Sequence, residues 1–429
     1  MGHLQMIRYI AVIALFVAPL SFAEDTAYLQ KLSLEQAIQI AMERNHDLQL
    51  SAFADANAKA ATVIASASPN PTLTIQTFNI NPRAGIGVGG PRSKTVDSTV
   101  RIDQLIERGD KRELRMENAS LLQDAARNDL HDARRQLRVT VSQSYYDLLA
   151  VEEKCGITRQ TASIYESTVV AAQKRQRAGD LANADVARLQ VDALRAQNDA
   201  TQAEADLAKA RQTLALALGK IAYATQIRLA DGWPATQFNA TTPPEELIER
   251  RSDVLAAKSR LVAAMASRKL ALASRSRDVS VGAQYEHWPT SKANAQGTGN
   301  SYGVAVQIPL FVRYQFDGEI RAAEVAVDTA RQTLEKTRDL ARSDLLKSWE
   351  DARASFERVR RYDDGLLAAA KKSADAAEFA FRHGALGVMD VLDARRTYRA
   401  TQLDALAARA DYAKSLAVQQ AAVSESNTQ

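Results

Sequence analysis

The sequence predicts a mostly α-helical protein that contributes to a small β-barrel and is built as an internal tandem repeat. Three observations predict this class. Similar segments recur about 205 residues apart, as Asp185-Val186 and Asp390-Val391 illustrate. Four stretches alternate apolar and polar residues with the period of a β-strand. Two segments, 111–177 and 318–382, are rich in Ala, Gln, Arg and Asp and would each extend about 100 Å as α-helices.

Residues 1–23 have the pattern of a secretory signal peptide. Arg8 supplies a positive charge, Tyr9–Leu20 is a short apolar run, and Ser21-Phe22-Ala23 offers small residues at the two positions that a signal peptidase recognises. The apolar run is too short to span a bilayer. We therefore expect an exported chain that begins at Glu24 and, because no cysteine follows the cleavage site, carries no lipid anchor there.

The composition argues against several functional classes. The formal net charge is only +4 over 429 residues, which leaves no electrostatic footprint for nucleic acid. The single cysteine, Cys155, cannot form an intramolecular disulfide. The five histidines lack metal-ligand spacing, and the sequence contains no phosphate-binding loop or nucleophile elbow. We therefore expect neither an enzyme nor a resident metal or cofactor.

The duplication divides the chain into two repeats. Residues 177–186 resemble residues 382–391, each with a glycine followed by Asp-Val, and the same spacing relates Leu105 to Leu310 and Arg108 to Arg313. A nearly constant offset in separate places indicates a tandem repeat. The predicted first repeat is 24–219, the second is 245–429, and 220–244 forms an equatorial connector.

Each repeat is predicted to contain the same elements. A capping box at Ser33–Gln36 opens a helix over 34–67, and Thr242 with two prolines opens its counterpart over 245–273. A strand pair and a long helical hairpin follow in each repeat. The predicted strands are 72–80 and 95–103, then 279–288 and 301–308. The predicted hairpins are 111–219, with its tip near Gly179, and 318–423, with its tip near Gly384.

Three features favour a membrane barrel over a soluble sandwich for these strands. The strands are about nine residues long, the linker 79–94 is rich in glycine and proline, and aromatic side chains mark the strand ends. The aromatic residues are Phe78, Tyr285, Trp288, Phe311 and Tyr314. Four strands cannot close a barrel. We therefore expect copies of the chain to pool their strands in one barrel in contact with outer-membrane lipid; three copies would supply twelve strands.

The helix lengths favour a tunnel. The return helices 183–219 and 389–423 are each about half the length of the long helices, and the first helix of a repeat makes up the difference. Two short helices stacked end to end would therefore lie beside each long helix. Alanine would allow these helices to approach closely and form a coiled wall.

These elements together resemble the TolC-type outer-membrane efflux family over essentially the whole mature chain. The resemblance rests on Leu32–Ile38, on Gln104–Arg112, and on the two glycine tips with their trailing Asp-Val. The Gly-Asp-Lys-Arg element within Gln104–Arg112 is most similar to the heavy-metal cation (CzcC-like) branch. The resemblance implies a trimeric twelve-stranded outer-membrane barrel that continues into a periplasmic α-helical tunnel. It also implies two partners, a periplasmic adaptor and an inner-membrane pump of the resistance–nodulation–division type.

The resemblance assigns roles to residues at the two tips. Gly179, Leu181, Gly384 and Leu386 would meet the adaptor. Asp390 and Asp393 match the aspartates that ring the narrowest part of the tunnel, where three copies would place six carboxylates. Relatives tie the aspartate at position 185 to a tyrosine and an arginine, but Phe381 and Leu386 stand at those positions here. We therefore expect a different latch, with Asp185, Arg382 and His383 as its candidates.

The function expected is a passive outer-membrane channel for divalent heavy-metal cations. One alternative is a channel for drugs or other organic compounds, because the sequence does not identify the cargo. Two further alternatives are a periplasmic adaptor and a structural coiled-coil rod. An adaptor would have one helical hairpin rather than two, and a rod would leave the strand pairs unexplained.

Overall fold

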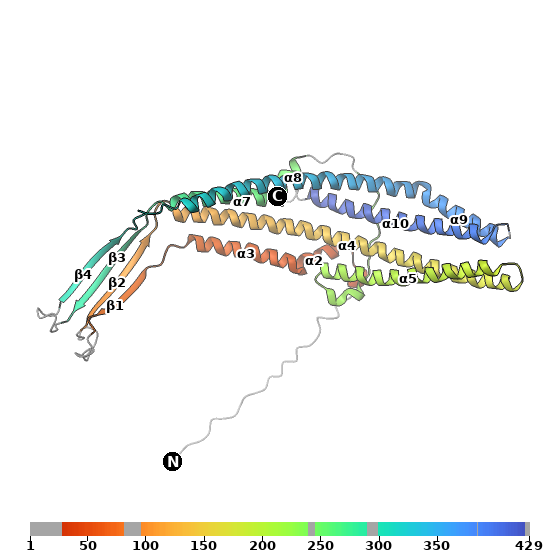
Figure 1. Cartoon of the computed structure of the whole chain (residues 1–429), viewed down its shortest axis with the longest axis horizontal. Helices are drawn as coiled ribbons and strands as arrows, with labels where there is room; N and C mark the ends of the chain where they lie inside the picture. The colour runs from red at the N-terminus through yellow and green to blue at the C-terminus, as the bar shows by residue number, and fades with distance from the viewer. Residues whose placement is uncertain (1–27, 81–95, 239–244, 290–298, 384, 425–429) are drawn as a thin grey trace, which may run out of the picture. The chain divides into compact units, whose positions relative to one another are not determined.

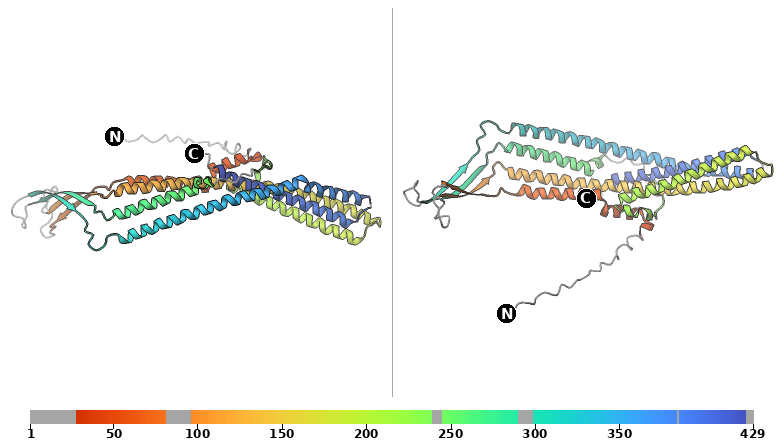
Figure 2. Two further views of the ribbon diagram at one scale, coloured as in Figure 1. Left: turned by 90° about the horizontal axis from the view of Figure 1, so that it is seen from above. Right: turned by 60° about the horizontal axis from the view of Figure 1, so that its bottom comes forward.

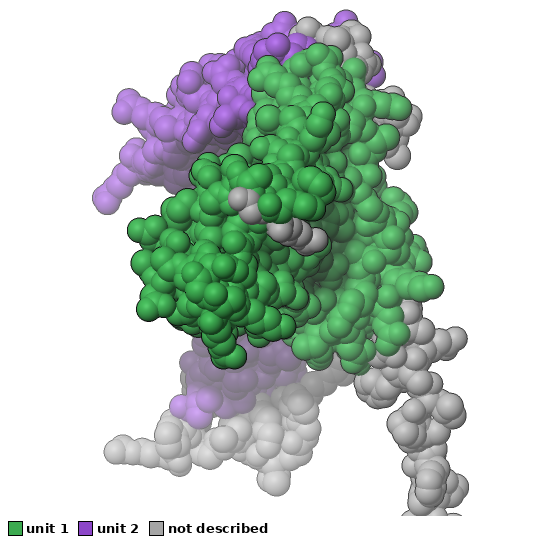
Figure 3. Space-filling view, turned by 90° about the vertical axis from the view of Figure 1, so that its right-hand side faces the viewer, with its two compact units in different colours: residues 1–45, 138–238, 354–417 green, residues 46–137, 239–353, 418–429 purple. Residues whose placement is uncertain are grey.

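Figure 1 shows a computed structural model of the chain, which describes residues 28–80, 96–238, 245–289, 299–383 and 385–424. The predicted signal peptide, Thr242 and Gly384 lie outside these residues. The described chain forms two compact units, coloured separately in Figure 3. Unit 1 takes 1–45, 138–238 and 354–417, and unit 2 takes the remainder. Each unit therefore contains segments of both predicted repeats.

Unit 2 contains a four-stranded antiparallel sheet in the order β1-β2-β3-β4. The strands are β1 (Thr72–Phe78), β2 (Asp97–Ile106), β3 (Val279–Trp288) and β4 (Gly299–Gln307). Both predicted strand pairs thus join one sheet, in which β2 pairs with β3 across the repeats. Compared with the predicted strands, β1 ends earlier, at Phe78, because Asn79 adopts φ 58°.

The register of the sheet produces complete apolar rows on one face. One row runs Leu73, Ile102, Ala283 and Val304, and the next runs Ile75, Val100, Tyr285 and Tyr302. Alternate residues of a strand point to opposite faces, so these eight side chains share one side. That side is uncovered in the single chain: Tyr302 is 83% exposed and Val304 80% exposed.

The helices of unit 2 continue from the strands. They are α3 (His46–Ser66), the first part of α4 (Lys111–Arg177), α6 (Glu246–Arg250), α7 (Ser252–Ala273) and the first part of α8 (Asp317–Arg361). A core cluster joins the last three: Ile248 comes from α6, Val254 and Ala257 come from α7, and Leu334, Ala341 and Leu345 come from α8. None of the helices in the described ranges is long and apolar enough to cross a membrane.

The prediction of one helix over 245–273 was wrong, because the chain breaks at Arg251. This residue is extended (φ −63°, ψ 138°) and separates α6 from α7. Its guanidinium is buried, pairs with Asp253 at 2.7 Å and donates to the carbonyl of Ala341. A buried charge needs such partners, and the extended backbone accompanies this placement.

The predicted helix over 34–67 is likewise two helices. The capping box at Ser33 and Gln36 is confirmed and opens α2 (Leu34–Arg44). Asn45 is then extended, and its buried side-chain amide donates to the carbonyl of Ala217 at 3.0 Å. The break therefore comes from a contact with a residue 172 positions away.

Two helical hairpins form the rest of unit 1. The last part of α4 runs beside α5 (Asn183–Ala217), and α9 (Leu367–Arg382) runs beside α10 (Val388–Ser424), as Figure 2 shows from two sides. The predicted long helix over 318–382 is interrupted by one π-helical turn, η4 (Tyr362–Leu366), which separates α8 from α9. A π-turn adds a residue to the helical ladder, so it changes which side chains face the neighbouring helix.

Two tyrosines attach the connector to the helices of unit 1. The hydroxyl of Tyr145, on α4, donates to the carbonyl of Leu32 and accepts from the backbone N–H of Asp231. The hydroxyl of Tyr412, on α10, donates to the carbonyl of Gln237 at 2.6 Å. Burial raises the pKa of Tyr145 to about 12. These bonds satisfy backbone groups of a segment that has little secondary structure of its own.

We predict that Gly219→Ala destabilises unit 1. Gly219 ends α5 with φ +66°, and an added Cβ would lie 2.5 Å from the carbonyl oxygen of Arg44. A left-handed alanine with this contact should cost about 1–3 kcal/mol and lower the melting temperature measured by circular dichroism. Gly232→Ala is the matched control, because its Cβ meets nothing within 4 Å. Equal melting temperatures for the two variants would contradict the prediction.

Candidate functional site

The first hairpin reverses direction at Gly179, as the sequence predicted. Gly179 adopts φ +85°, which favours glycine. The N–H of Asp180 donates to the carbonyl of Arg175 at 2.9 Å, and the N–H of Gly179 donates to that of Gln176. This pattern satisfies the last carbonyls of α4 in the manner of a Schellman motif. Nothing lies within 4 Å of the Cβ position at Gly179, so the tip is open to a partner.

An apolar cluster joins the two hairpins just behind this tip. It contains Tyr165 and Ala172 from α4, Val186, Leu189, Ala193 and Ala196 from α5, and Val388 and Leu392 from α10. Leu181 and Phe381 are half-buried and pack against it. Leu181 therefore has a structural contact in addition to its predicted place at the tip. Burial also raises the pKa of Tyr165.

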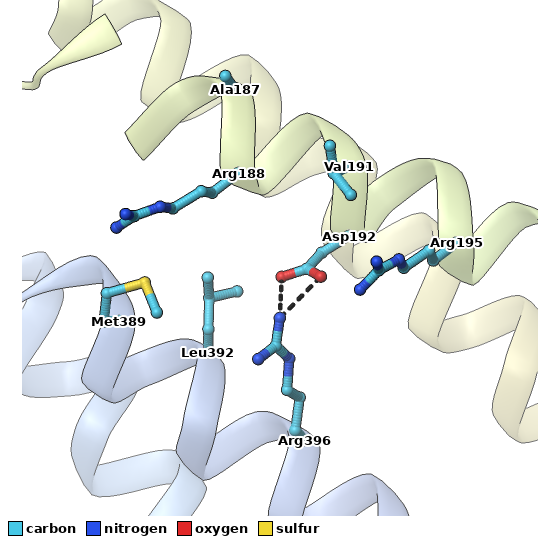
Figure 4. A pocket seen from close by; sticks show the side chains of 8 residues that line it. All are labelled: Ala187, Arg188, Val191, Asp192, Arg195, Met389, Leu392 and Arg396. Carbon is cyan, nitrogen blue, oxygen red and sulfur yellow. Dashed lines mark hydrogen bonds and ion pairs between the residues drawn. The ribbon is translucent and has the colours of Figure 1, made fainter. Parts of the chain in front are cut away.

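Three arginines of α10 continue from this cluster and form ion pairs; we call Arg395, Arg396 and Arg399 the arginine clamp. Arg396 pairs with Asp192 of α5, with one nitrogen 2.6 and 2.7 Å from the two carboxylate oxygens (Figure 4). Arg399 pairs with Asp199 of α5 at 2.6 Å. Two of the arginines thus connect the second hairpin to α5.

Arg395 extends the clamp to two further helices. It pairs with Glu378 of α9 at 2.9 Å and donates to the hydroxyl of Thr168 of α4 at 3.0 Å. The clamp and the apolar cluster together connect α4, α5, α9 and α10 at this end of unit 1. The separation of the two hairpins therefore depends on a few charged contacts as well as on apolar packing.

Among the ion pairs of the clamp, the Arg396–Asp192 pair has the most buried acidic side chain. The side chain of Asp192 is 9% exposed, whereas that of Arg396 is 50% exposed. The hydrogen bonds to Asp192 raise the pKa of the Arg396 guanidinium. A carboxylate this buried is expensive to leave without its cation, because desolvation is not recovered.

The clamp borders a groove between α5 and α10 with a volume of about 290 Å³. Figure 4 shows its lining, in which Val191, Leu392 and Met389 supply apolar contacts and three arginines supply charge. The complete lining is Ala187, Arg188, Val191, Asp192, Arg195, Met389, Leu392 and Arg396. The groove could accept an apolar side chain with an acidic neighbour.

Asp390 and Asp393 lie on the first turns of α10 and are exposed to solvent. Val391 and Leu392, which lie between them, are buried. The two carboxylates therefore face away from the apolar cluster, on a surface that copies of the chain could share. Within one chain, no group of three or more His, Cys, Asp or Glu side chains in the described residues could hold a metal ion.

The latch candidates have separate surroundings. Asp185 is in the first turn of α5 and lies 3.8 Å from Arg188. His383 follows α9, its ring lies 4.2 Å from that of Phe379, and its Nδ1 is 2.8 Å from the carbonyl of Phe379. Arg382 is the last residue of α9.

Phe381 and Leu386, which stand where relatives carry a tyrosine and an arginine, lie close to the apolar cluster and the turn. Phe381 packs on the apolar cluster, and Arg175 lies over its ring at 5.0 Å. Leu386 is half-buried in the turn before α10.

Sequence reasoning missed the clamp, although the sequence contains a signal for it. Val186, Leu189, Ala193 and Ala196 form the buried stripe of α5, and Asp192 falls on that stripe three residues after Leu189. An acidic residue on an apolar stripe implies a basic partner. The partner is Arg396, which lies 204 positions further along the chain. No local sequence pattern could identify it, because the contact depends on the tertiary structure.

Comparisons with known proteins agree with this architecture. The family described as "Outer membrane efflux protein" matches residues 37–220 and 244–422. The cobalt-zinc-cadmium resistance protein CzcC of Cupriavidus metallidurans is 27% identical over 329 residues, which are 74% of each protein. A membrane protein from Pseudomonas aeruginosa matches with a TM-score of 0.76 and 20% identity, covering 91% of this chain and 93% of that one. CusC matches with a TM-score of 0.75 and 17% identity, covering 91% of each chain.

We predict that Arg396→Ala loosens the end of unit 1, because it leaves the buried Asp192 carboxylate without its cation. The expected loss is about 1–3 kcal/mol, seen as faster hydrogen exchange in the first turns of α10. Arg159→Ala is the control: it breaks the Arg159–Glu204 pair, whose side chains are 60% and 52% exposed, and it should leave hydrogen exchange close to that of the wild type, because solvent screens an exposed ion pair. Similar exchange in the two variants would contradict the prediction.

Proposed function

Because the chain belongs to the outer membrane efflux protein family, we propose that it is the outer-membrane channel of a tripartite efflux system for divalent heavy-metal cations. In this proposal the channel is passive. An inner-membrane pump of the resistance–nodulation–division type and a periplasmic adaptor deliver the cargo to it. The cation is the cargo and not a resident cofactor.

The observation that carries the proposal is the four-stranded sheet with an uncovered apolar face. Its rows of Leu, Ile, Val and Tyr side chains are exposed in the single chain, while the opposite face carries charged and amide groups. A lipid-facing outside and a polar inside are the arrangement that a membrane strand needs. In the part of the chain that the structure describes, the outer strands β1 and β4 have one unpaired edge each, so three copies could pair them and close a twelve-stranded barrel.

The far ends of the hairpins support the proposed role of the tips. Gly179 is open, Leu181 and Leu386 are half-buried, and α10 begins beside them. We assign Gly179, Leu181, Gly384 and Leu386 to adaptor docking, as the family pattern suggests. The groove beside the clamp lies on the same unit and offers both apolar and charged contacts.

Asp390 and Asp393 are proposed to form the selectivity ring. Both are exposed on α10 with their neighbours Val391 and Leu392 turned inward. Three copies would bring six carboxylates to one constriction, which would favour cations. Metal cargo is favoured over organic cargo by one further observation, the similarity to a protein named for cobalt, zinc and cadmium resistance.

The proposed cargo can be tested by deletion of the gene and complementation. Deletion should increase sensitivity to zinc, cobalt and cadmium, and the wild-type chain should restore growth, because efflux requires an outlet through the outer membrane. Sensitivity to drugs alone would support the alternative of an organic-compound channel. Unchanged sensitivity to both classes, in a strain that lacks related channels, would contradict the proposal. A trimer that withstands detergent and dissociates on heating would exclude a periplasmic adaptor or a coiled-coil rod.

We also propose that charged residues keep the tip closed, and this can be tested by conductance. Asp185, Arg382 and His383 are candidates for a latch, and they lie near the clamp and the apolar cluster, which together connect the second hairpin to the first. Asp185→Ala with Arg382→Ala should increase single-channel conductance in planar bilayers, because the proposed latch would lose two of its three candidate residues. Arg159→Ala, on the exposed part of α4, should leave conductance as in the wild type. Conductance unchanged in the double variant would remove Asp185 and Arg382 from the latch.

A further inference from the structure

The polar face of the sheet carries an ordered set of side chains that the adaptor, the tip and the aspartate ring do not involve. Three rows cross it in register: Thr72, Asp103, Gly282 and Ala305; Thr74, Arg101, Gln284 and Gly303; Gln76, Thr99, Glu286 and Ser301. These residues alternate with those of the apolar rows, so they share the other side of the sheet. Each row places long polar side chains next to residues with small or absent side chains.

Arg101 and Asp103 of β2 neutralise each other on this face. The Nε of Arg101 lies 2.8 and 2.9 Å from the two carboxylate oxygens of Asp103, and the second terminal nitrogen lies 2.7 Å from one of them. The pair lies directly over Gly282 of β3: a Cβ there would be 2.2 Å from the Asp103 carboxylate and 3.2 Å from Arg101 Nε. Glycine therefore creates the space in which the pair lies along the sheet.

Gln284 lies over a second glycine in the same way. A Cβ at Gly303 would be 3.0 Å from Cγ of Gln284. In this position the Gln284 amide donates to Glu286 at 3.2 Å, and the hydroxyl of Ser301 donates to the other oxygen of Glu286 at 3.3 Å. Both donors are neutral. Among the described residues Glu286 has no ion-pair partner, so its negative charge is oriented but not cancelled.

We propose that this face is a cation-favouring filter in the channel, in which Glu286 supplies the charge and Gly282 and Gly303 keep the bore open. This inference rests on the proposed function, because it requires the polar face to line the pore. Within the three rows, Arg101, Asp103 and Glu286 sum to one negative charge per chain. Asp97, at the start of β2, lies on the same face beyond these rows and adds a second negative charge. Three copies would therefore hold three negative charges in the rows and three more at the Asp97 positions.

The filter acts through electrostatic potential and not through a narrow fit. Side chains that lie along the sheet leave the bore wide, and fixed charges on a pore wall raise the local concentration of the opposite ion. Screening limits the effect to about 10 Å at 0.1 M salt and about 3 Å at 1 M. A charge on the lining should therefore matter at low salt and lose most of its influence at high salt.

The test is a charge series measured as reversal potential in planar bilayers under a potassium chloride gradient. The background is Asp390→Asn with Asp393→Asn, which removes the proposed ring at the tips. Arg101→Gln makes the sheet more negative, whereas Glu286→Gln and Asp103→Asn each remove one negative charge. Cation preference should fall in the order Arg101→Gln, unsubstituted background, then Glu286→Gln and Asp103→Asn. Each substitution should change the cation-to-anion permeability ratio by about twofold at 0.1 M salt. This change should be smaller at 1 M salt.

Misfolding cannot produce the expected result, because the substitutions should change the permeability ratio in opposite directions. Damage to the barrel would not increase cation preference in Arg101→Gln. Each variant is also checked for a heat-dissociable trimer. The same ratio in all four channels, or a difference that persists at 1 M salt, would overturn the inference. If the wild-type trimer forms no channel at all, the proposed function fails first, and the two failures are thus distinguishable.

The glycines give an independent arm. Gly282→Ala leaves the charges unchanged but displaces the Arg101–Asp103 pair, so conductance should fall while the permeability ratio stays near that of the parent. Gly299→Ala is the matched control on β4, because its Cβ would make only an ordinary contact, 3.7 Å from Trp288. Equal conductance in Gly282→Ala and Gly299→Ala would contradict the assigned role of Gly282.

Discussion

The rest of the architecture depends on a four-stranded sheet that is unfinished within one chain. Among the described residues, its outer strands, β1 and β4, each have an edge that no further strand pairs, and one of its faces presents exposed Leu, Ile, Val and Tyr side chains. An exposed edge beside an exposed apolar face favours association. In a bilayer the backbone groups must also be satisfied internally, which an open sheet cannot achieve. Closure through further copies and contact with lipid would meet both requirements.

The same constraint explains why the polar face is so orderly. A sheet that closes on itself brings its inner side chains together, and arginine or glutamine side chains that project from the wall would fill a small bore. Gly282 and Gly303 let Arg101, Asp103 and Gln284 lie along the strands instead. Glycine weakens a strand interior. At these two positions the space that it leaves for the neighbouring side chains compensates for that weakness. The apolar face, which would meet lipid, contains no glycine in its two central rows.

Sequence patterns predicted the elements whose causes are local. The alternation of four strands, the capping box at Ser33, the uninterrupted α4 and the glycine turn at Gly179 are properties of neighbouring residues, and the structure contains all four. The breaks at Asn45 and Arg251 were missed because no local pattern shows that the side chains of these residues reach distant carbonyls, those of Ala217 and Ala341. The π-turn at Tyr362–Leu366 was missed as well, since helix-forming residues on both sides of Gly365 predict a continuous helix.

In the candidate site, too, the local features could be predicted from the sequence and the long-range contacts could not. Asp390 and Asp393 could be placed on one helix face from their spacing, because position on a helix follows from sequence alone. Whether an acidic side chain is a free carboxylate or half of an ion pair depends on what lies opposite. Asp192 and Asp390 have similar helical contexts, yet Asp192 is buried against Arg396 and Asp390 is exposed. The first can stabilise contact between hairpins but has little charge left for a passing cation. The second keeps its charge available, and so does Glu286 on the sheet, where both partners are neutral. Under the proposed function, selectivity would come from acids that are positioned without a cationic partner, and contact between the hairpins is stabilised by acids that are paired.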